Sequence, residues 1–310
     1  MTRQQNNVLV VGSANMDLVM RVHEMPRPGE TVLGTAFIRA HGGKGANQAV
    51  AAARLGAEVQ FLGCLGEDAF GDALLQGMAV EGIQLNSVKR TADAPTGTAM
   101  ILVNDQGENS IVVHSGANFE LTPADIEANS TMFDAADIVL LQLETPLETV
   151  QRSLELAAAC GCVSILDVGS DQALPEAVWS TASVISPNIH EAARLAALRP
   201  DNDKSPHDIA EMLYNQYGVT VVMKLGGEGS LYLGADGYQS APAFSVKPVD
   251  TTAAGDAFTG ALGVFWGTME MTDVLRHANA AGALAVTREG AQPSLPTREA
   301  LASFISSQSS

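Results

Sequence analysis

The sequence predicts an α/β fold with a doubly wound, mostly parallel sheet flanked by helices and a small β-sheet lid. Short apolar runs bounded by turn residues alternate with longer segments of helical period. Continuous apolar strands interleaved with helices are typical of a parallel sheet that is covered on both faces. The strands expected from these runs are residues 8–12, 59–63, 138–143, 163–167, 183–186 and 219–224.

Helical segments fit between these strands, where each would form a right-handed crossover. The crossover helices expected are residues 46–55, 147–159, 189–197 and 206–217. After Gly255 the chain is expected to become largely helical. The helices expected there are residues 256–266, 272–287 and 297–306.

Two regions break the alternation and predict the lid. Residues 16–22 pair with 31–40, and residues 96–103 pair with 109–114 across a turn-rich tetrapeptide, Asn104 to Gly107. The lid strands therefore fall within about 16–40 and 96–114. At 310 residues, with no internal repeat or low-complexity linker, the chain is expected to form a single domain over 1–310 with this lid as an appendage.

Composition and charge exclude several classes of protein. The chain is 46% apolar, which is enough for a globular core. Its net charge of −18 repels nucleic acid and anionic membranes. No apolar run approaches the ~18 residues of a membrane span and no signal segment is seen, so a cytoplasmic location is expected. Cys64, Cys160 and Cys162 fit neither a redox pair nor a zinc site and are expected to be buried free thiols.

The segment from Asp250 to Gly260 carries the most chemistry, because small residues precede an apolar helix there. Small residues leave the amides at a helix start open to an anion, and the helix dipole adds positive charge. Asp256 would then accept a proton from a substrate hydroxyl while those amides stabilise a transferred phosphoryl group. The alternative is that Asp256 is merely the N-cap of the helix.

Two upstream segments suit a polyhydroxylated ligand. Gly42-Gly43-Lys44-Gly45-Ala46-Asn47 is neither a P-loop, because Gly45 follows the lysine, nor a dinucleotide fingerprint, because Gln48 occupies the third glycine position. Its glycines allow close approach of the backbone to a ligand. Asn15 and Asp17, one residue apart in an extended segment, could bind vicinal hydroxyls, or form an Asx turn.

Two further segments leave alternatives open. The glycine-rich stretch 226–230 would let a nucleotide lie against the backbone, or would be an ordinary turn between strands. Asn188 with Glu191 three residues later is close to a capping box, and capping could be their entire role. A zinc protease site is rejected because Arg194 stands where the second histidine should be.

Together these motifs resemble the ribokinase branch of the phosphofructokinase-B-type sugar kinases over essentially the whole chain. G-S-x-N-x-D, G-G-K-G-A-N and D-T-x-A-A-G-D occur in the family's order. The resemblance implies ATP-dependent phosphorylation of D-ribose at O5, with ATP, Mg²⁺ and an activating K⁺, in a homodimer formed through the lid. A small-molecule sugar and ATP would be the partners, with no nucleic acid and no membrane.

The resemblance also implies roles for individual residues. Asp256 would be the catalytic base beside an anion hole formed by Ala253, Ala254 and Gly255. The sugar would be held by Asn15, Met16, Asp17, Gly43, Lys44, Gly45, Ala46, Asn47, Glu144 and Asp256. ATP with its metal would contact Asn188, Glu191, Lys224, Leu225, Gly226, Gly227, Glu228, Gly229, Gly255 and Asn279. The loops around K⁺ would include Asp250, Thr252, Ala285, Arg288, Gly290 and Ser294.

The stretch from Asp167 to Asp171 departs from the Asn/Asp-Pro-Ala-Pro-Ala usual in this branch and could alter phosphate or magnesium geometry. The alternatives are a kinase for deoxyribose, a ketohexose or a nucleoside, and a non-catalytic sugar or nucleotide sensor. A Rossmann dehydrogenase is set aside because the first strand leads into Gly12-Ser13-Ala14-Asn15-Met16, which lacks the glycine fingerprint.

Overall fold

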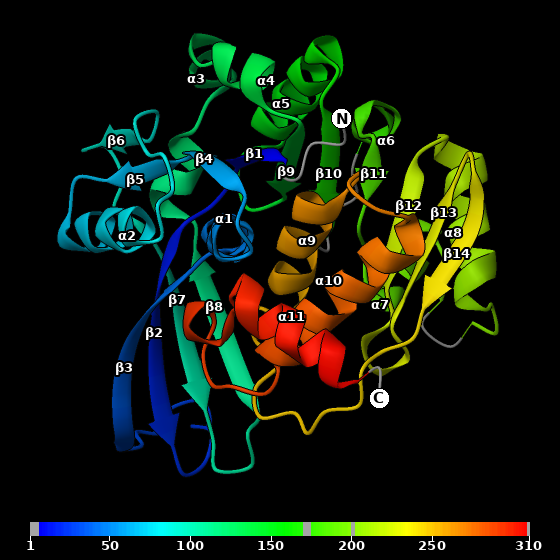
Figure 1. Cartoon of the computed structure of the whole chain (residues 1–310). Coiled ribbons are helices and arrows are strands. Elements are labelled where there is room, and N and C mark those ends of the chain that lie inside the picture. The colour runs from blue at the N-terminus through cyan, green and yellow to red at the C-terminus, as the bar shows by residue number, and fades with distance from the viewer. Residues whose placement is uncertain (1–5, 170–174, 200–201, 309–310) are drawn as a thin grey trace.

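The computed structural model describes residues 6–169, 175–199 and 202–308, and its main element is an eight-stranded sheet (Figure 1). The strand order is β14-β13-β12-β11-β10-β9-β1-β4, parallel from β4 to β12 and antiparallel from β12 to β14. The strands are β1 (Asn7–Val11), β4 (Glu58–Leu62), β9 (Ile138–Gln142), β10 (Val163–Asp167), β11 (Val184–Ile185), β12 (Thr220–Lys224), β13 (Ser230–Gly234) and β14 (Gly237–Ala241). The predicted doubly wound, mostly parallel sheet is confirmed.

Helices cover both faces of this sheet because its apolar side chains alternate in direction along each strand. In β1, Val8 and Val10 pack on one side, and Leu9 and Val11 on the other. The first face is covered by α1 (Lys44–Arg54), α2 (Ala69–Val80), α9 (Ala254–Phe265), α10 (Met271–Ala285) and α11 (Arg298–Ser307). The second is covered by α3 (Pro123–Ala128), α4 (Thr131–Ala135), α5 (Leu147–Cys160), α6 (Glu176–Thr181), α7 (Ile189–Leu195) and α8 (Pro206–Tyr217).

The strand order places the ligand-binding edge. From β1 the chain pairs β4 on one side and β9 on the other, so the winding reverses at β1. In open α/β sheets, ligands bind beyond the carboxyl ends of the strands at such a reversal. The described residues also form short 3₁₀ turns, which are η1 (Gly116–Glu120), η2 (Gly226–Glu228) and η3 (Gln292–Ser294).

A four-stranded sheet projects beside this edge in the order β3-β2-β7-β8, and we call it the lid (Figure 1). Its strands are β2 (Asn15–Val22), β3 (Gly34–Gly42), β7 (Gly97–Val103) and β8 (Asn109–His114). Both predicted hairpins are present. They are joined by parallel pairing of β2 with β7, which the sequence pattern did not indicate. A separate two-stranded sheet pairs β5 (Cys64–Gly66) with β6 (Lys89–Thr91).

Several expectations needed correction. Cys64 and Cys162 are buried, but Cys160 is exposed, because it is the last residue of α5 and precedes the left-handed Gly161 that ends the helix. The helix expected at 189–197 ends at Leu195, and Ala197 then adopts φ 54°. Within the described ranges, none of the helices is both long and apolar enough to cross a membrane.

Candidate active site

Polar side chains gather at the carboxyl ends of two central strands. β9 ends at Gln142 and β10 ends at Asp167, and both side chains are buried. Gln48 of α1 joins them, because its Nε2 donates to Asp167 Oδ2 over 2.9 Å and its Oε1 accepts from Gln142 Nε2 over 2.7 Å. The cluster therefore lies at the edge where the topology places a ligand.

Asp256 lies in the first turn of α9 with both carboxylate oxygens hydrogen-bonded. Asn47 Nδ2 donates to its Oδ2 over 2.9 Å, and Gln48 Nε2 donates to its Oδ1 over 3.1 Å. Ala253 is the N-cap of the helix, so the N-cap alternative for Asp256 is wrong. Burial raises the pKa of Asp256 to about 6, although the nearby Lys44 ammonium lowers it. A buried carboxylate that is ionised at neutral pH can act as a general base.

The backbone entering α9 has an uncommon conformation. Ala253 has φ 58°, in the left-handed region, which costs a residue with a side chain on the order of 1 kcal/mol. None of the described residues accepts a hydrogen bond from the N–H groups of Ala253, Gly255 or Asp256, whereas the Ala254 N–H donates to the Thr251 carbonyl over 3.3 Å. Two of the three amides expected in the anion hole are thus open, and the helix dipole favours an anion there.

Two lysines converge on Asp167. Lys224 Nζ lies 2.7 Å from Asp167 Oδ1, and Lys44 Nζ lies 3.9 Å from Asp167 Oδ2. Burial acts to raise the pKa of Asp167, but the two lysines hold it below its usual value, and Asp167 in turn raises the pKa of Lys44. A Cβ on Gly169 would come within 1.6 Å of Lys44 Nζ, so the backbone after β10 touches this lysine. Residues 170–174, which include the rest of the departing stretch, lie outside the described residues.

The predicted sugar-holding residues at the base of the lid meet at the same edge of the sheet. Asp17 is buried, and burial together with the charges of Glu144 and Asp256 raises its pKa to about 7. Glu144 Oε2 accepts from Ser13 Oγ over 2.5 Å and from the Lys44 N–H over 3.1 Å. Three carboxyl groups therefore lie near one another, which suits a ligand that presents hydroxyl donors.

Close backbone approach explains the glycines here. A Cβ on Gly43, whose φ is 86°, would come within 2.7 Å of the Asn15 backbone nitrogen. The Asn15 side chain is also fixed, because its Oδ1 accepts from Asn118 Nδ2 over 2.7 Å. Met16 and Ala46 are buried in the core, so any ligand contact they make comes from their backbone. The Gly45 N–H donates to Ser13 Oγ over 3.4 Å.

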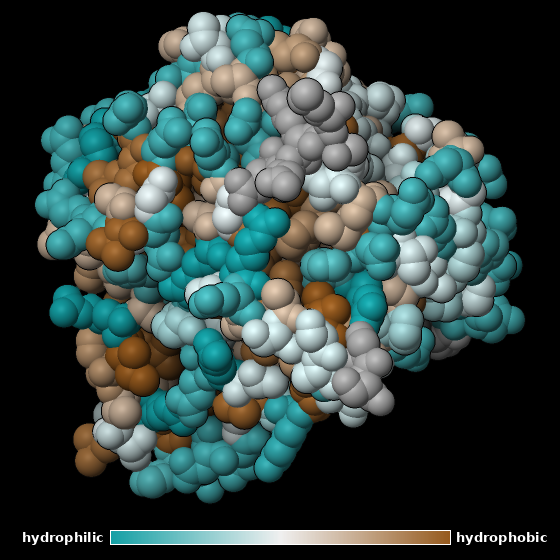
Figure 2. All heavy atoms as spheres, in the orientation of Figure 1, coloured by the Kyte–Doolittle hydropathy of each residue, from teal (hydrophilic) through white to brown (hydrophobic). Residues whose placement is uncertain are grey.

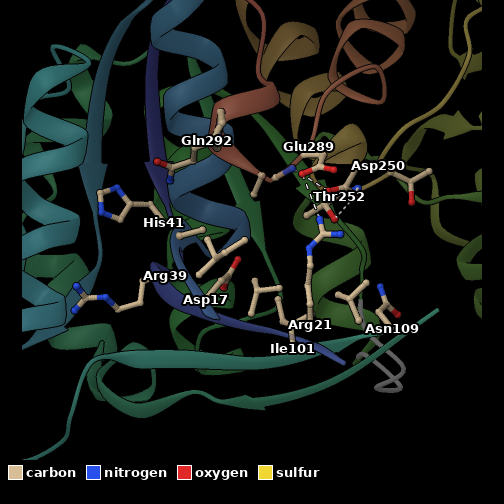
Figure 3. A pocket seen from close by; sticks show the side chains of 18 of the residues that line it. Asp17, Arg21, Arg39, His41, Ile101, Asn109, Asp250, Thr252, Glu289 and Gln292 are labelled. Carbon is tan, nitrogen blue, oxygen red and sulfur yellow. Dashed lines mark hydrogen bonds and ion pairs between the residues drawn. The ribbon is translucent and has the colours of Figure 1, made fainter. Parts of the chain in front are cut away.

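An open cleft of about 1460 Å³ separates the lid from the loops that precede α9 and follow α10. Figure 3 shows Asp17, Arg21 and Ile101 on the lid side of this cleft and Asp250, Thr252 and Glu289 across from them. Arg21 NH2 reaches across to Glu289 Oε2 over 3.2 Å. The lid thus forms one wall of this cleft, and of the predicted sugar-holding residues Asp17 lines it.

The predicted nucleotide residues border the other side of the anion hole. A Cβ on Gly255 would lie 3.9 Å from Lys224 Nζ, and a Cβ on Gly226 or Gly227 would meet nothing within 4 Å. The stretch 225–229 is a tight turn closed by the Leu225 N–H donating to the Gly229 carbonyl over 2.8 Å, with Glu228 inside it. Open space beside a glycine turn is what a bound nucleotide requires.

Two of the predicted nucleotide contacts have clear structural duties. Asn188 and Glu191 form the capping box of α7, with the Asn188 N–H donating to Glu191 Oε2 over 2.7 Å and the Glu191 N–H donating to Asn188 Oδ1 over 2.9 Å. Glu191 Oε1 would still lie 3.7 Å from a Cβ on Gly169 and so faces the site. Asn279 Nδ2 donates to the carbonyls of Ala241 and Pro242, which leaves its oxygen for a ligand.

The predicted cation loops are also held together. Asp250 Oδ2 accepts from the Gly290 N–H over 2.9 Å, and Asp250 Oδ1 accepts from the Thr252 N–H over 2.9 Å. The Arg288 N–H donates to the Ala285 carbonyl over 3.2 Å. In the same region Ser294 Oγ donates to the Ala291 carbonyl over 2.7 Å. Oxygen atoms of this kind, one carboxylate and backbone carbonyls, are ligands that a hard cation takes.

Sequence reasoning missed several polar residues of the site. They are Ser13, Gln48, Asn118, Gln142 and, as a site residue, Asp167. A usable signal existed for two of them, because Gln142 and Asp167 end apolar strands at the carboxyl edge of a parallel sheet.

The fold and the site define an enzyme that transfers a phosphoryl group to a sugar hydroxyl. The model of the pfkB family of carbohydrate kinases matches residues 5–298, and the chain belongs to this family. The ribokinase of Haemophilus influenzae is 36% identical over 304 residues, covering 97% of this chain and 99% of that protein.

Other relatives widen the comparison. The bifunctional ribokinase/ribose-5-phosphate isomerase A of Fructilactobacillus sanfranciscensis is 36% identical over 301 residues, but the chain spans 56% of that protein's length. The deoxyribokinase of Salmonella typhi is 33% identical, covering 97% of this chain and 99% of that protein. Among solved structures, Arabidopsis thaliana ribokinase complexed with ribose and ATP has a TM-score of 0.89 at 32% identity, covering 97% of this chain and 98% of that chain.

Proposed function

We propose that the protein transfers the γ-phosphoryl group of ATP to O5 of D-ribose to give D-ribose 5-phosphate. The observation that carries this proposal is the position of Asp256, a buried carboxylate in the first turn of α9, next to the open N–H groups of Ala253 and Gly255. General-base removal of a hydroxyl proton and stabilisation of a migrating phosphoryl group need these two features side by side.

The sugar would lie between the lid and the carboxyl edge of the sheet, held by the predicted residues of both. Asp17, Asn15 and Glu144 offer oxygen acceptors for its hydroxyls, and Lys44 offers a cation. O5 would then face Asp256, whose carboxylate accepts the proton as the new P–O bond forms. The bond from phosphorus to the β,γ-bridging oxygen breaks, and ADP leaves.

The nucleotide would occupy the open space beside the 225–229 turn, with its phosphates directed to the start of α9. Lys224 supplies a cation near that start, because its Nζ would lie 3.9 Å from a Cβ on Gly255. We propose that Mg²⁺ lies with the phosphates, near Glu191, and that K⁺ is held by the loops around Asp250 and Gly290. Bound K⁺ would supply a fixed positive charge behind the anion hole, and the Asp250 to Gly290 hydrogen bond would hold the two loops in place.

We infer that the protein forms a homodimer through the lid. Large apolar side chains are exposed on it, and brown side chains are visible over this region at the lower left of Figure 2. By the pairing register, Phe37, Met100 and Val112 share one face of the lid, whereas Ile38 and Ile111 line the cleft on the other face. Contiguous exposed apolar patches mark interaction surfaces. The cytoplasmic location stays a prediction.

A second candidate substrate is deoxyribose, favoured by the deoxyribokinase relative. The test is ADP release by the purified protein with Mg²⁺, with and without K⁺, for ribose, deoxyribose, a ketohexose and a nucleoside, ranked by kcat/KM. A site that hydrogen-bonds a hydroxyl rejects the analogue that lacks it by a large factor. We expect ribose to rank first. Binding of ribose without ADP release would instead identify a sensor and overturn the proposal.

A further inference from the structure

Gln48 has an unusual set of partners. Its side chain is 0% exposed, so it is not open to a bound ligand. Its single amide nitrogen donates to two carboxylates, Asp256 over 3.1 Å and Asp167 over 2.9 Å. Because ionised carboxylates only accept hydrogen bonds, these two partners fix which end of the amide is the nitrogen, and its oxygen accepts from Gln142 Nε2 over 2.7 Å. Both N–H bonds are therefore directed by the surrounding hydrogen bonds.

The backbone that carries Gln48 is also firmly placed. α1 packs closely on α9, because a Cβ on Gly260 would come within 2.6 Å of Ala51 Cβ and 3.1 Å of the Gln48 carbonyl oxygen. Gln48 and Asp256 therefore lie on two helices in tight contact. A donor fixed in this way holds its acceptor in one orientation.

We propose that Gln48 is the positioning residue of the catalytic carboxylate: it orients Asp256 toward the substrate hydroxyl and connects it to the ion cluster of Asp167. Gln48 touches no substrate and acts through Asp256. The inference rests on the proposed function in one respect, because it takes Asp256 to be the base.

The amide has two effects on the base. Together with Asn47, it gives each carboxylate oxygen one N–H donor, which leaves the remaining lone pairs for the substrate proton. It also stabilises the ionised form, since hydrogen bonds to a carboxylate lower its pKa. The charged groups that face Asp256 are Lys44 from α1, Asp167 from β10 and Asp17 from β2.

The expected pH dependence follows from the sign of the effect. The active form of the base is ionised, so the rate falls as the pH is lowered through the pKa of Asp256, about 6. Removing a donor destabilises the ionised form and raises this pKa. The acid limb of the kcat profile then moves to higher pH.

The test is the pH profile of ribose-dependent ADP formation for the wild type and Gln48→Met, a substitution of similar shape without a donor. We expect the acid limb to move up by about 1 pH unit, the scale of one hydrogen bond to a charged group. On the alkaline side kcat should stay lower by about tenfold, because the carboxylate is no longer oriented. KM for ribose should change little, since the Gln48 side chain is 0% exposed and so is not open to the sugar.

Two more variants make the result decisive. Gln142→Met removes the donor to the Gln48 oxygen, so the Gln48 amide can turn. It should shift the acid limb in the same direction by a smaller amount. This variant provides the test if Gln48→Met does not fold. Asn6→Leu is the matched control: Asn6 is a buried amide that donates to the Gly263 carbonyl over 3.0 Å at the far end of α9. It should leave the acid limb where it is.

The carboxyl ¹³C shift of Asp256, followed by NMR against pH, measures the same pKa without turnover. A wild type that forms no ADP would overturn the proposed function, while this titration would still decide the role of Gln48. Folded Gln48→Met with the wild-type Asp256 pKa and the wild-type acid limb would overturn the inference.

Discussion

The eight-stranded sheet and the lid use their apolar residues in opposite ways. In the main sheet, β9 is buried along its whole length and its side chains pack into two cores. In the lid, every residue of β8 is exposed. The main sheet therefore supplies a rigid edge for Asp167 and for the helices that carry Gln48 and Asp256. The lid supplies one wall of the cleft, and its exposed apolar residues contribute little to the stability of the fold.

The largest contrast is expected in stability. Phe61→Ala, in the buried strand β4, should lower the free energy of unfolding by about 3–5 kcal/mol, the usual cost of emptying a core site. Urea denaturation of the folded variant measures it. Val112→Ala, in exposed β8, is the matched lid variant and should change the same quantity by less than about 0.5 kcal/mol. Equal losses at the two positions would contradict the comparison.

A smaller loss is expected from the ion cluster at the sheet edge. Lys224→Met removes the nearest partner of the buried Asp167 carboxylate and should cost about 3 kcal/mol at pH 7. The pKa of Asp167 is held below its usual value. The ion pair therefore stabilises the fold fully at any pH above the usual pKa, and this stabilisation is lost as the pH falls through the lowered pKa. The difference in stability between the variant and the wild type should therefore begin to shrink below about pH 4 and close as the pH falls through the lowered pKa of Asp167. A difference that does not depend on pH would argue against this origin.

A substitution on the lid should change the oligomeric state of the protein. Val112→Asp places a charge on the exposed apolar face of β8, where Val112 is 70% exposed. We expect a shift from dimer to monomer in light scattering after gel filtration. Stability of the monomer should change by less than about 1 kcal/mol, because the Val112 side chain is mostly exposed in the subunit. A wild-type protein that is monomeric at all concentrations would contradict the proposed dimer.

The smallest effect is expected where the two regions meet. The pair between Arg21 of the lid and Glu289 has side chains that are 47% and 68% exposed. Exposed ion pairs contribute about 0–1 kcal/mol, so Arg21→Ala should move the thermal midpoint only slightly. A large drop in thermal stability would mean that the lid is part of the folding unit.

Much of the fold followed from the sequence because buried parallel strands are continuous apolar runs. The strand expected at 163–167 and the helix expected at 206–217 have the bounds that the structure shows. Shorter elements, such as β11 with its two residues, leave a weak pattern. The parallel pairing of β2 with β7 joins residues about eighty positions apart, which no local pattern encodes.

The site was predictable where the chemistry lies in a motif, and less so where it lies in contacts. Asp256 and its small neighbours stand out in the sequence because they open an apolar helix. Gln48 lies within an alanine-rich helix, where a glutamine is an ordinary helix former. Its role depends on Asp167 and Gln142, which come from distant strands, and only the folded chain brings the three together.

The measurement that tests the account most directly is Asp256→Asn, assayed for ADP formation and for ribose binding by calorimetry. The substitution keeps the shape of the side chain and removes the base, so kcat should fall by about 10²-fold or more while the ribose Kd stays nearly unchanged. Turnover close to that of the wild type would contradict the role of this carboxylate and the reaction proposed around it.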